Sequence, residues 1–349
     1  MFSSEEKGEL AMEQRNQTLG SCAPLGLVLS GGGAKGAYQA GVWKALVEMG
    51  IDERVTAISG TSVGAINAAA FASIRDPERI RKIWHQRISS VVSPNFKALS
   101  PIEVLTAIER WLDGKQFPIQ GILDRDCVSK ILSDELPISW PEDSPAIHAT
   151  SLETRGASFG ELDRSSYKKV HFRIDQEIDS DKRIKEVLAS CAIPWCYSPV
   201  EIDGKRYVDG GWNAMGGENT PVQPILKNHP EIRTIIVVRC NSRDIEPEGI
   251  KLPRHSVVRL VEIRPSKPLS GIFDIGNLGG GILAGAMFPG ITGGVLLRSA
   301  IMAVAGFFMS RQAQVWGATL AFAPRFTDQF FNVGYKDALV AIERQRLNL

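Results

Sequence analysis

The sequence predicts an α/β fold with a mostly parallel central sheet and helices on both faces. Two observations predict it: residues 25–73 repeat the order strand, tight turn, helix, and 44% of the 349 residues are hydrophobic. The repeated order is typical of a parallel sheet covered by helices. The hydrophobic content and the length are sufficient for a large core in one large domain or two small ones.

The first repeat begins with the short apolar run LGLVL at 25–29, which predicts a buried strand. A glycine-rich loop follows, and from Ala34 to Met49 the apolar residues recur at helical spacing. Gly50 is placed to end this helix. A second strand is predicted at 55–59, followed by another tight turn and an alanine-rich helix.

The rest of the chain continues the alternation. Residues 77–135 have amphipathic helical patterns, interrupted by Pro94, Pro101 and Pro118. Further elements are expected along the chain. They are strands at 146–152, 157–162 and 168–174, a helix at 181–190, a short strand ending at Asp209, and strands at 234–240 and 257–264.

Charge and cysteine content exclude several classes of function. The 40 basic and 39 acidic residues leave a net charge of +1, so the balance gives no electrostatic reason to expect a nucleic acid partner. The five cysteines are odd in number and form no CxxC pair, which favours a reducing compartment over disulfides or a metal site. Residues 1–23 are polar and lack the apolar stretch of a signal peptide, so we interpret them as a mobile extension. A cytoplasmic location is expected, with export by a dedicated secretion system as the alternative.

A glycine-rich apolar segment lies at 271–309, and its part from 275 to 297 carries no charge. That length is sufficient for a membrane span. Its glycines and its proline instead favour a buried or flap-like segment. A surface that dips into lipid and a spanning helix are the two alternatives.

The glycine loop matches GxGxxG through Gly31, Gly33 and Gly36, the pattern of dinucleotide-binding proteins. That pattern requires an acidic residue at the end of the second strand, whereas Asp52 precedes the strand. A phosphate-binding P-loop requires a lysine after its last glycine, and Ala37 stands there. Neither nucleotide motif therefore fits.

The second tight turn, Gly60-Thr61-Ser62-Val63-Gly64, matches the GxSxG nucleophile elbow between a strand and a helix. The serine of such an elbow lies on a sharp turn, which requires small neighbours. Its hydroxyl is exposed at the helix N-terminus, where the dipole favours developing negative charge. We therefore predict that Ser62 is a nucleophile.

A serine nucleophile gives the glycine loop a function. Attack on an ester produces an oxyanion that needs aimed backbone N–H donors. Glycines allow close approach and can point successive amides into a concave nest. We predict that Gly32, Gly33 and Ala34 are the donors and that Lys35 is structural or tunes the local field. The predicted oxyanion hole comprises Gly31, Gly32, Gly33, Ala34, Lys35 and Gly36.

The general base has three candidates. His229 and His255 follow the serine in the order expected of an α/β hydrolase triad, but neither lies in a motif that would fix its orientation. Asp209 ends a short strand, and Gly210 and Gly211 follow it. These two glycines are either an ordinary tight turn or the means by which the carboxylate reaches the elbow.

The glycine loop, the GxSxG elbow and the Asp209-Gly210-Gly211 motif resemble, in order and spacing, the patatin-like phospholipase family. The stretch ASCAIPWCYSPVEIDGKRYVDGG and Asn219-Thr220-Pro221 also resemble that family. The resemblance implies a three-layer sandwich of the patatin or lysophospholipase type. It implies a catalytic core at 24–240, and residues 241–349 are then the C-terminal part of the same domain, with FNVGYKDALVAI as the closing helix.

The resemblance also implies a Ser–Asp dyad without histidine, in which Ser62 attacks the acyl carbonyl and Asp209 accepts its proton. It implies a cofactor-free lipid acyl hydrolase of the phospholipase A or lysophospholipase type, which acts on phospholipid or lysophospholipid at a membrane surface. A peripheral membrane association follows from this, and a protein activator is left open. The alternatives are a general carboxylesterase or acyltransferase with the same dyad, and a membrane-binding module without turnover.

Four acidic residues fall near EF-hand spacing, which makes a calcium site an alternative. Ser180 occupies the position that requires glycine, and basic residues lie inside the loop. We therefore predict no metal and a solvated turn that caps the helix at 181–190. The four acidic residues are Asp175, Glu177, Asp179 and Glu186.

Overall fold

The structure is a computed structural model that describes residues 23–88, 93–94, 123–136, 140, 143–155, 163–194, 196–244, 246–250, 252, 257–269 and 322–344. Several sequence predictions lie outside these residues: the extension up to residue 22, the interruptions at Pro101 and Pro118, the strand at 157–162, His255, and the apolar segment 271–309. Among the described residues, no helix has both the length and the apolar character needed to cross a membrane.

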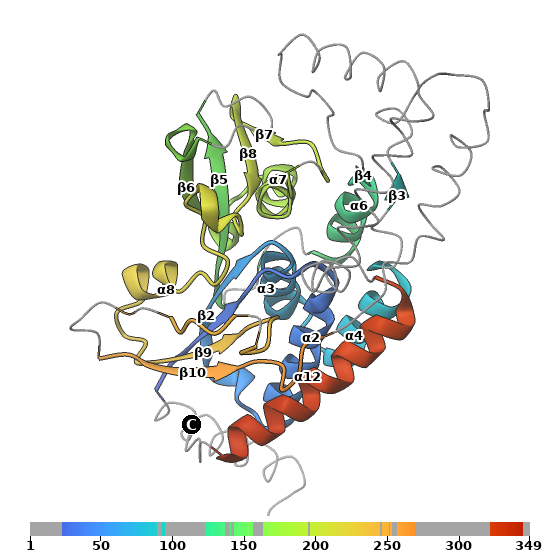
Figure 1. The fold of residues 1–349 in the computed structure, drawn as a ribbon, viewed down its shortest axis with the longest axis vertical. Helices are drawn as coiled ribbons and strands as arrows, with labels where there is room; N and C mark the ends of the chain where they lie inside the picture. The colour runs from blue at the N-terminus through green and yellow to red at the C-terminus, as the bar shows by residue number, and fades with distance from the viewer. Residues whose placement is uncertain are drawn as a thin grey trace, which may run out of the picture.

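The described elements follow the predicted alternation (Figure 1), except that two short strands, Ser93–Pro94 and Leu123–Asp124, lie within the region 77–135 for which helical patterns are predicted. The strands are β1 (Leu25–Leu29), β2 (Val55–Thr61), β3 (Ser93–Pro94), β4 (Leu123–Asp124), β5 (Ala146–Thr154), β6 (Tyr167–Arg173), β7 (Val200–Ile202), β8 (Lys205–Asp209), β9 (Thr234–Val238) and β10 (Arg259–Ile263). The α-helices are α2 (Gly36–Glu48), α3 (Val63–Ser73), α4 (Pro77–Gln86), α6 (Asp126–Glu135), α7 (Ser180–Ser190), α8 (Gln223–Asn228) and α12 (Pro324–Arg344).

Eight of these strands form one mixed sheet in the order β10-β9-β1-β2-β5-β8-β7, and β6 pairs with β5 outside this path. The five strands from β10 to β5 are parallel to one another. The strands β6, β7 and β8 are antiparallel to their neighbours. The α/β class and the mostly parallel centre are confirmed, with an antiparallel addition beyond β5.

Two strands share one edge of β5 and meet end to end there. Thr61, the last residue of β2, pairs with Thr150, whereas Asp209, the last residue of β8, pairs with Ser151. Since β6 pairs along the same length of β5, it occupies the opposite edge. The C-terminal ends of β2 and β8 therefore point toward each other, and the residues that follow them converge on one place.

The sheet is covered on both faces, because alternate side chains of its strands enter different clusters. Leu27 and Ile236 belong to the larger core beneath α2, α3 and α12. Val28 and Val237 belong to a second cluster with Ile225 of α8. Burial of these two apolar faces gives the three-layer arrangement.

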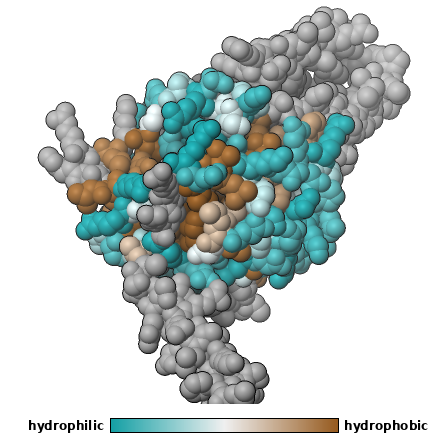
Figure 2. All heavy atoms as spheres, turned by 90° about the horizontal axis from the view of Figure 1, so that it is seen from below, coloured by the Kyte–Doolittle hydropathy of each residue, from teal (hydrophilic) through white to brown (hydrophobic). Residues whose placement is uncertain are grey.

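Helix α12 lies along α2 and α4 (Figure 1). Glycines allow the close approach of α12 to α2: a Cβ atom at Gly334 would overlap the backbone carbonyl of Tyr38, and one at Gly41 would overlap that of Phe331. Phe330 is fully buried in the same contact. Seen from below, hydrophobic side chains remain visible between hydrophilic ones on the surface (Figure 2).

Candidate active site

Ser62 lies at the turn between β2 and α3 with φ 57° and ψ −129°, a conformation that costs a non-glycine residue about 1–3 kcal/mol. The glycines of the motif make this turn sterically possible. A Cβ atom at Gly60 would overlap the carbonyl of Gly64, and one at Gly64 would overlap that of Leu29. The GxSxG pattern therefore forms the sharp strand-to-helix turn that the sequence predicts.

Ser190, the last residue of α7, holds this turn in place. Its buried hydroxyl accepts a hydrogen bond from the Ser62 N–H at 2.9 Å and donates one to the Thr150 carbonyl at 2.5 Å. A single hydroxyl thus connects the strained backbone to β5. No sequence motif marks Ser190, because only the folded sheet brings it to a residue 128 positions away.

Asp209 lies at the end of β8, beside the elbow, and is 6% exposed. Its Oδ1 accepts a hydrogen bond from the Gly211 N–H at 2.6 Å. Its buried Oδ2 makes no hydrogen bond of standard length and angle to the described residues. The Ser62 hydroxyl is nevertheless near enough to favour the charged carboxylate.

Burial has the largest effect on the pKa of this carboxyl group. Desolvation raises the pKa of Asp209 from 3.8 to about 6, and the hydroxyl of Ser62 and the N–H of Gly211 partly oppose that rise. A carboxylate with this pKa is a stronger base than an ordinary aspartate and is still mostly ionised at pH 7. The structure therefore places a tuned carboxylate beside a strained serine.

The glycine loop between β1 and α2 lies beside Ser62, because a Cβ atom at Gly31 would lie 3.2 Å from the Ser62 Cβ atom. The Gly31 N–H is bonded to the Asn219 carbonyl and the Lys35 N–H to the Gly32 carbonyl. Within the described residues, no backbone partner accepts from the N–H groups of Gly32 and Gly33. Gly33 has φ 57° and lines the cavity that contains Ser62.

The segment after Asp209 accepts hydrogen bonds from the elbow and from the glycine loop. The Thr61 hydroxyl donates to the Glu218 carbonyl at 2.7 Å, and the Gly31 N–H donates to the Asn219 carbonyl at 2.9 Å. A side chain at Gly31 or Gly211 would overlap the amide oxygen of Asn219 or crowd it. Bare backbone is required because these segments pack against one another.

A buried polar network lies beneath the glycine loop. Gln39 donates to the Ser30 carbonyl at 2.7 Å, and Asn67 donates to the Gly36 carbonyl and to the Gln39 side chain, both at 2.9 Å. The ammonium group of Lys35 donates to Asn241 at 2.8 Å, and burial lowers the pKa of Lys35. This network fixes both ends of the loop.

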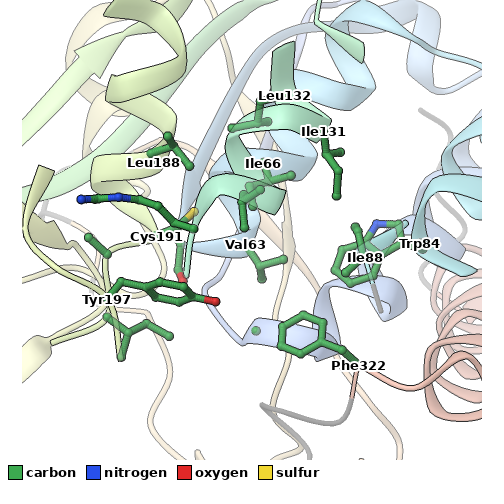
Figure 3. Close-up of a pocket in the computed structure, with 16 residues that line it drawn as sticks. Val63, Ile66, Trp84, Ile88, Ile131, Leu132, Leu188, Cys191, Tyr197 and Phe322 are labelled. Carbon is green, nitrogen blue, oxygen red and sulfur yellow. The ribbon is translucent and has the colours of Figure 1, made fainter. Parts of the chain in front are cut away.

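An apolar cavity opens beside Ser62, and its empty space of about 680 Å³ includes some open solvent at its mouth. Figure 3 shows its lining, with Tyr197 on one side and Trp84 and Ile88 on the opposite side. Arg125 is the charged side chain in the lining, and its guanidinium donates to the carbonyls of Ser198 and Pro199. The cavity is therefore suited to a hydrocarbon chain.

His229 contacts other groups instead of the elbow. Its Nε2 lies 2.9 Å from Nε2 of His148, and its Nδ1 lies 3.4 Å from a carboxylate oxygen of Glu231. Burial lowers the pKa of His148 to about 4. The structure thus separates His229 from Ser62 by placing it in a histidine pair.

Two of the four acidic residues that fall near EF-hand spacing, Asp175 and Asp179, have local structural partners. Asp179 caps α7 by accepting from the N–H groups of Asp181 and Lys182, as predicted for a capping turn. Asp175 accepts from the Ile147 N–H at 2.7 Å and from Arg173. No cluster of three potential metal ligands occurs in the part of the chain that the structure describes.

An α/β sheet that carries a strained serine at a strand-to-helix elbow is the arrangement found in serine hydrolases. A family model described as patatin-like phospholipase matches residues 27–226, which is more than half of the chain. The chain therefore belongs to the patatin-like phospholipase family.

The chain is similar to several known proteins. Patatin-like phospholipase domain-containing protein 7 of Rattus norvegicus is 42% identical over 81 residues, which is 22% of this chain and 6% of that protein. An uncharacterized NTE family protein of Mycobacterium bovis is 30% identical over 196 residues, which is 55% of this chain and 44% of that protein. The chain thus spans less than half the length of either relative. VipD from Legionella pneumophila aligns over 93% of this chain and 67% of its own, with a TM-score of 0.43 and 13% identity.

Proposed function

We propose that this protein is a serine lipid acyl hydrolase of the phospholipase A or lysophospholipase type that works through a Ser62–Asp209 dyad. The observation that carries the proposal is that the C-terminal ends of strands β2 and β8 meet beside β5. Asp209 and the turn at Ser62 follow β8 and β2, which meet end to end there. The apolar cavity begins at the same serine.

In the first half of the reaction, Asp209 accepts the proton of the Ser62 hydroxyl as Oγ attacks the ester carbonyl carbon. The tetrahedral intermediate collapses, and the bond between that carbon and the alcohol oxygen breaks. Asp209 then returns the proton to the departing alcohol oxygen. The product is an acyl ester on Ser62, and the glycerol part of the lipid leaves.

In the second half, a water molecule attacks the acyl-enzyme, and Asp209 accepts its proton. The bond between the acyl carbon and Ser62 Oγ breaks, and the proton passes to Oγ. The fatty acid leaves and the free serine is regenerated. The pKa of about 6 supports Asp209 in this role, because a base works best when its pKa lies near the working pH.

The oxyanion of both intermediates needs donors that are free and fixed. The N–H groups of Gly32, Gly33 and Ala34 are the proposed donors, since the neighbouring loop amides already have carbonyl partners. The strained turn at Ser62 and the buried network beneath the loop hold donors and nucleophile in a constant relation. The other residues of the proposed site are those of the glycine loop, the elbow and the motif that begins at Asp209.

The substrate class follows from the cavity and the family. An apolar cavity beside the nucleophile fits the acyl chain of a lipid better than a small polar ester. Phospholipid or lysophospholipid is therefore the proposed substrate, taken from a membrane surface by a peripherally bound enzyme. An acyltransferase would use the same acyl-enzyme and an alcohol in place of water.

The test is to incubate the purified protein with mixed phospholipid and lysophospholipid vesicles and to measure released fatty acids by mass spectrometry. Ser62→Ala and Asp209→Asn should each lower the rate by several orders of magnitude, because nucleophile and base act as a unit. Both variants should keep the native circular dichroism spectrum. Excess EDTA should leave the rate unchanged.

The matched control is His229→Ala, which removes the other base candidate that the structure describes. We expect it to keep most of the activity, because His229 is paired with His148. An inactive His229→Ala beside an active Asp209→Asn would move the base to histidine. Transfer of the acyl group to added glycerol would favour the acyltransferase alternative.

A further inference from the structure

A second cavity lies behind the one that contains Ser62. The empty space of the front cavity is about 680 Å³ and that of the rear cavity about 370 Å³, and both values include some open solvent. Five apolar residues line both: Ile66, Trp84, Ile88, Ile131 and Leu132. The two spaces are therefore adjacent, and these side chains form the partition between them.

Trp84 is the largest member of the partition and is held rigidly. Its indole N–H donates to the Asn67 side chain at 3.1 Å, and its side chain is 3% exposed. Two of its ring carbons lie 2.7 Å from the position that a Cβ atom at Gly36 would take, so the ring packs on bare backbone. A buried ring with a hydrogen-bonded edge cannot rotate aside without removing the donor from the Asn67 side-chain oxygen.

We propose that Trp84 determines the acyl-chain length that this protein accepts, because its ring closes the front cavity and keeps the rear cavity out of reach of the bound chain. This inference rests on the proposed function only in taking the occupant to be an acyl chain. A chain bound at Ser62 then extends to the indole ring and stops there. The part of a longer chain that does not fit in the front cavity folds back or remains in solvent.

The test measures binding of saturated fatty acids of 8 to 18 carbons, below their micelle concentrations, by isothermal titration calorimetry. In the wild type, affinity should rise about fourfold per added methylene while the methylene is buried, and then level off at one length. In Trp84→Leu, the affinity should continue to rise for at least two further methylenes. That extension corresponds to a gain of more than tenfold for the longest chains.

Two variants separate the lost ring volume from the lost hydrogen bond. Trp84→Phe removes the N–H but keeps an aromatic wall, so its affinity should level off at the wild-type length. The double variant Trp84→Leu with Ala70→Leu fills the rear cavity, since Ala70 lines only the rear one, and should restore the wild-type limit. An unchanged limit in a folded Trp84→Leu protein would overturn the proposal.

Ala70→Leu with Trp84 intact is a test that does not depend on the stability of the tryptophan variants. It should leave the binding profile unchanged, because the rear cavity is closed in the wild type. A selective loss of affinity for long chains would show that they already pass Trp84, and the proposal would be wrong. Fatty acid binding does not require turnover, so a protein that shows this length limit but hydrolyses no ester would contradict the proposed function and not the role of Trp84.

Discussion

At the scale of one residue, Asp209 shows how burial changes the acidity of the proposed general base. Burial shields its carboxyl group from water and raises the pKa of that group to about 6. The base must be ionised to accept a proton, so activity should be lost as the pH falls through this value. We expect kcat/KM to rise about tenfold per pH unit below 6 and to be constant above about 7.

The measurement is kcat/KM for a soluble ester from pH 4.5 to 8.5, with the unfolding temperature followed over the same range. The free enzyme's base determines this profile, so the substrate does not shift it. A midpoint near 4 would show an ordinary, hydrated carboxyl group. In that case burial does not tune the base.

Ser190 is the second residue whose role can be tested singly. Ser190→Ala leaves the Ser62 N–H and the Thr150 carbonyl without their hydroxyl partner, which should cost about 1–3 kcal/mol of stability. The strained turn at Ser62 loses its support, so kcat should fall at least tenfold while KM changes little. Urea unfolding and steady-state kinetics measure the two effects.

Ser73→Ala is the matched control for Ser190→Ala. The Ser73 hydroxyl donates to the Ala69 carbonyl within α3, so its loss removes a local hydrogen bond and leaves the elbow untouched. We expect small changes in stability and in kcat. Equal losses of kcat in both variants would mean that Ser190 is an ordinary structural serine.

At the scale of elements, local patterns predicted most of the fold. The strand at 25–29 and the helix that ends at Gly50 agree closely with the structure, because apolar spacing and the glycine cap are local signals. Strand β2 continues to Thr61, two residues beyond the predicted end, because Gly60 and Thr61 still pair with β5. That pairing joins distant residues, so the local pattern does not contain it.

Strand β7 was missed, although the sequence holds a signal for it. Asp203 and Gly204 both have positive φ and connect β7 to β8 in a two-residue hairpin. An Asp-Gly pair between two strand-like runs is a strong hairpin signal. The order of the strands carries no comparable signal, because β9 pairs with β1 although residues 30–233 lie between them.

The residues of the candidate site also fall into two groups: those that a local sequence pattern predicts and those that it does not. Ser62, Asp209 and the glycine loop could be predicted because each lies in a short motif with its own steric logic. Ser190 and Trp84 could not, because their roles depend on contacts with Thr150 and Asn67 that the folded sheet and its helices create. Motifs therefore predict the groups proposed to react, whereas the tertiary structure determines the groups that contact and position them.

The crossing of α2 and α12 gives a prediction for a pair of elements. A Cβ atom at Gly334 would overlap the Tyr38 backbone carbonyl, so Gly334→Ala must push the helices apart. We expect a loss of at least 1–3 kcal/mol in the free energy of unfolding, typical of an overpacked core. Equilibrium unfolding in urea measures it.

The control for Gly334→Ala is Gly249→Ala, because nothing lies within 4 Å of a Cβ atom at Gly249. That variant should be as stable as the wild type or slightly more stable, since alanine restricts the unfolded chain. If both variants unfolded at the same urea concentration, the close contact of the two helices would not contribute to stability.

At the scale of the whole molecule, the C-terminal part of the chain packs against the elements that carry the glycine loop. Strand β10 pairs with β9, which in turn pairs with β1, the strand that leads into the glycine loop. Helix α12 covers α2, the helix that begins at the end of that loop. Phe330 and Phe331 of α12 are almost fully buried in the main core.

We therefore predict that residues 24–240, although they contain Ser62 and Asp209, do not form an active protein by themselves. Without α12, burial of the two phenylalanines is lost, which costs about 1.5–3 kcal/mol for each side chain, and the apolar face of α2 is exposed to water. Loss of β10 also leaves β9 as an open edge strand that can pair with other chains. The shortened protein should aggregate or bind the dye ANS, and it should hydrolyse no ester, whereas the 349-residue chain should unfold cooperatively. A soluble 24–240 fragment with a sharp unfolding transition and the full rate of hydrolysis would show that the sheet is complete without β10 and α12.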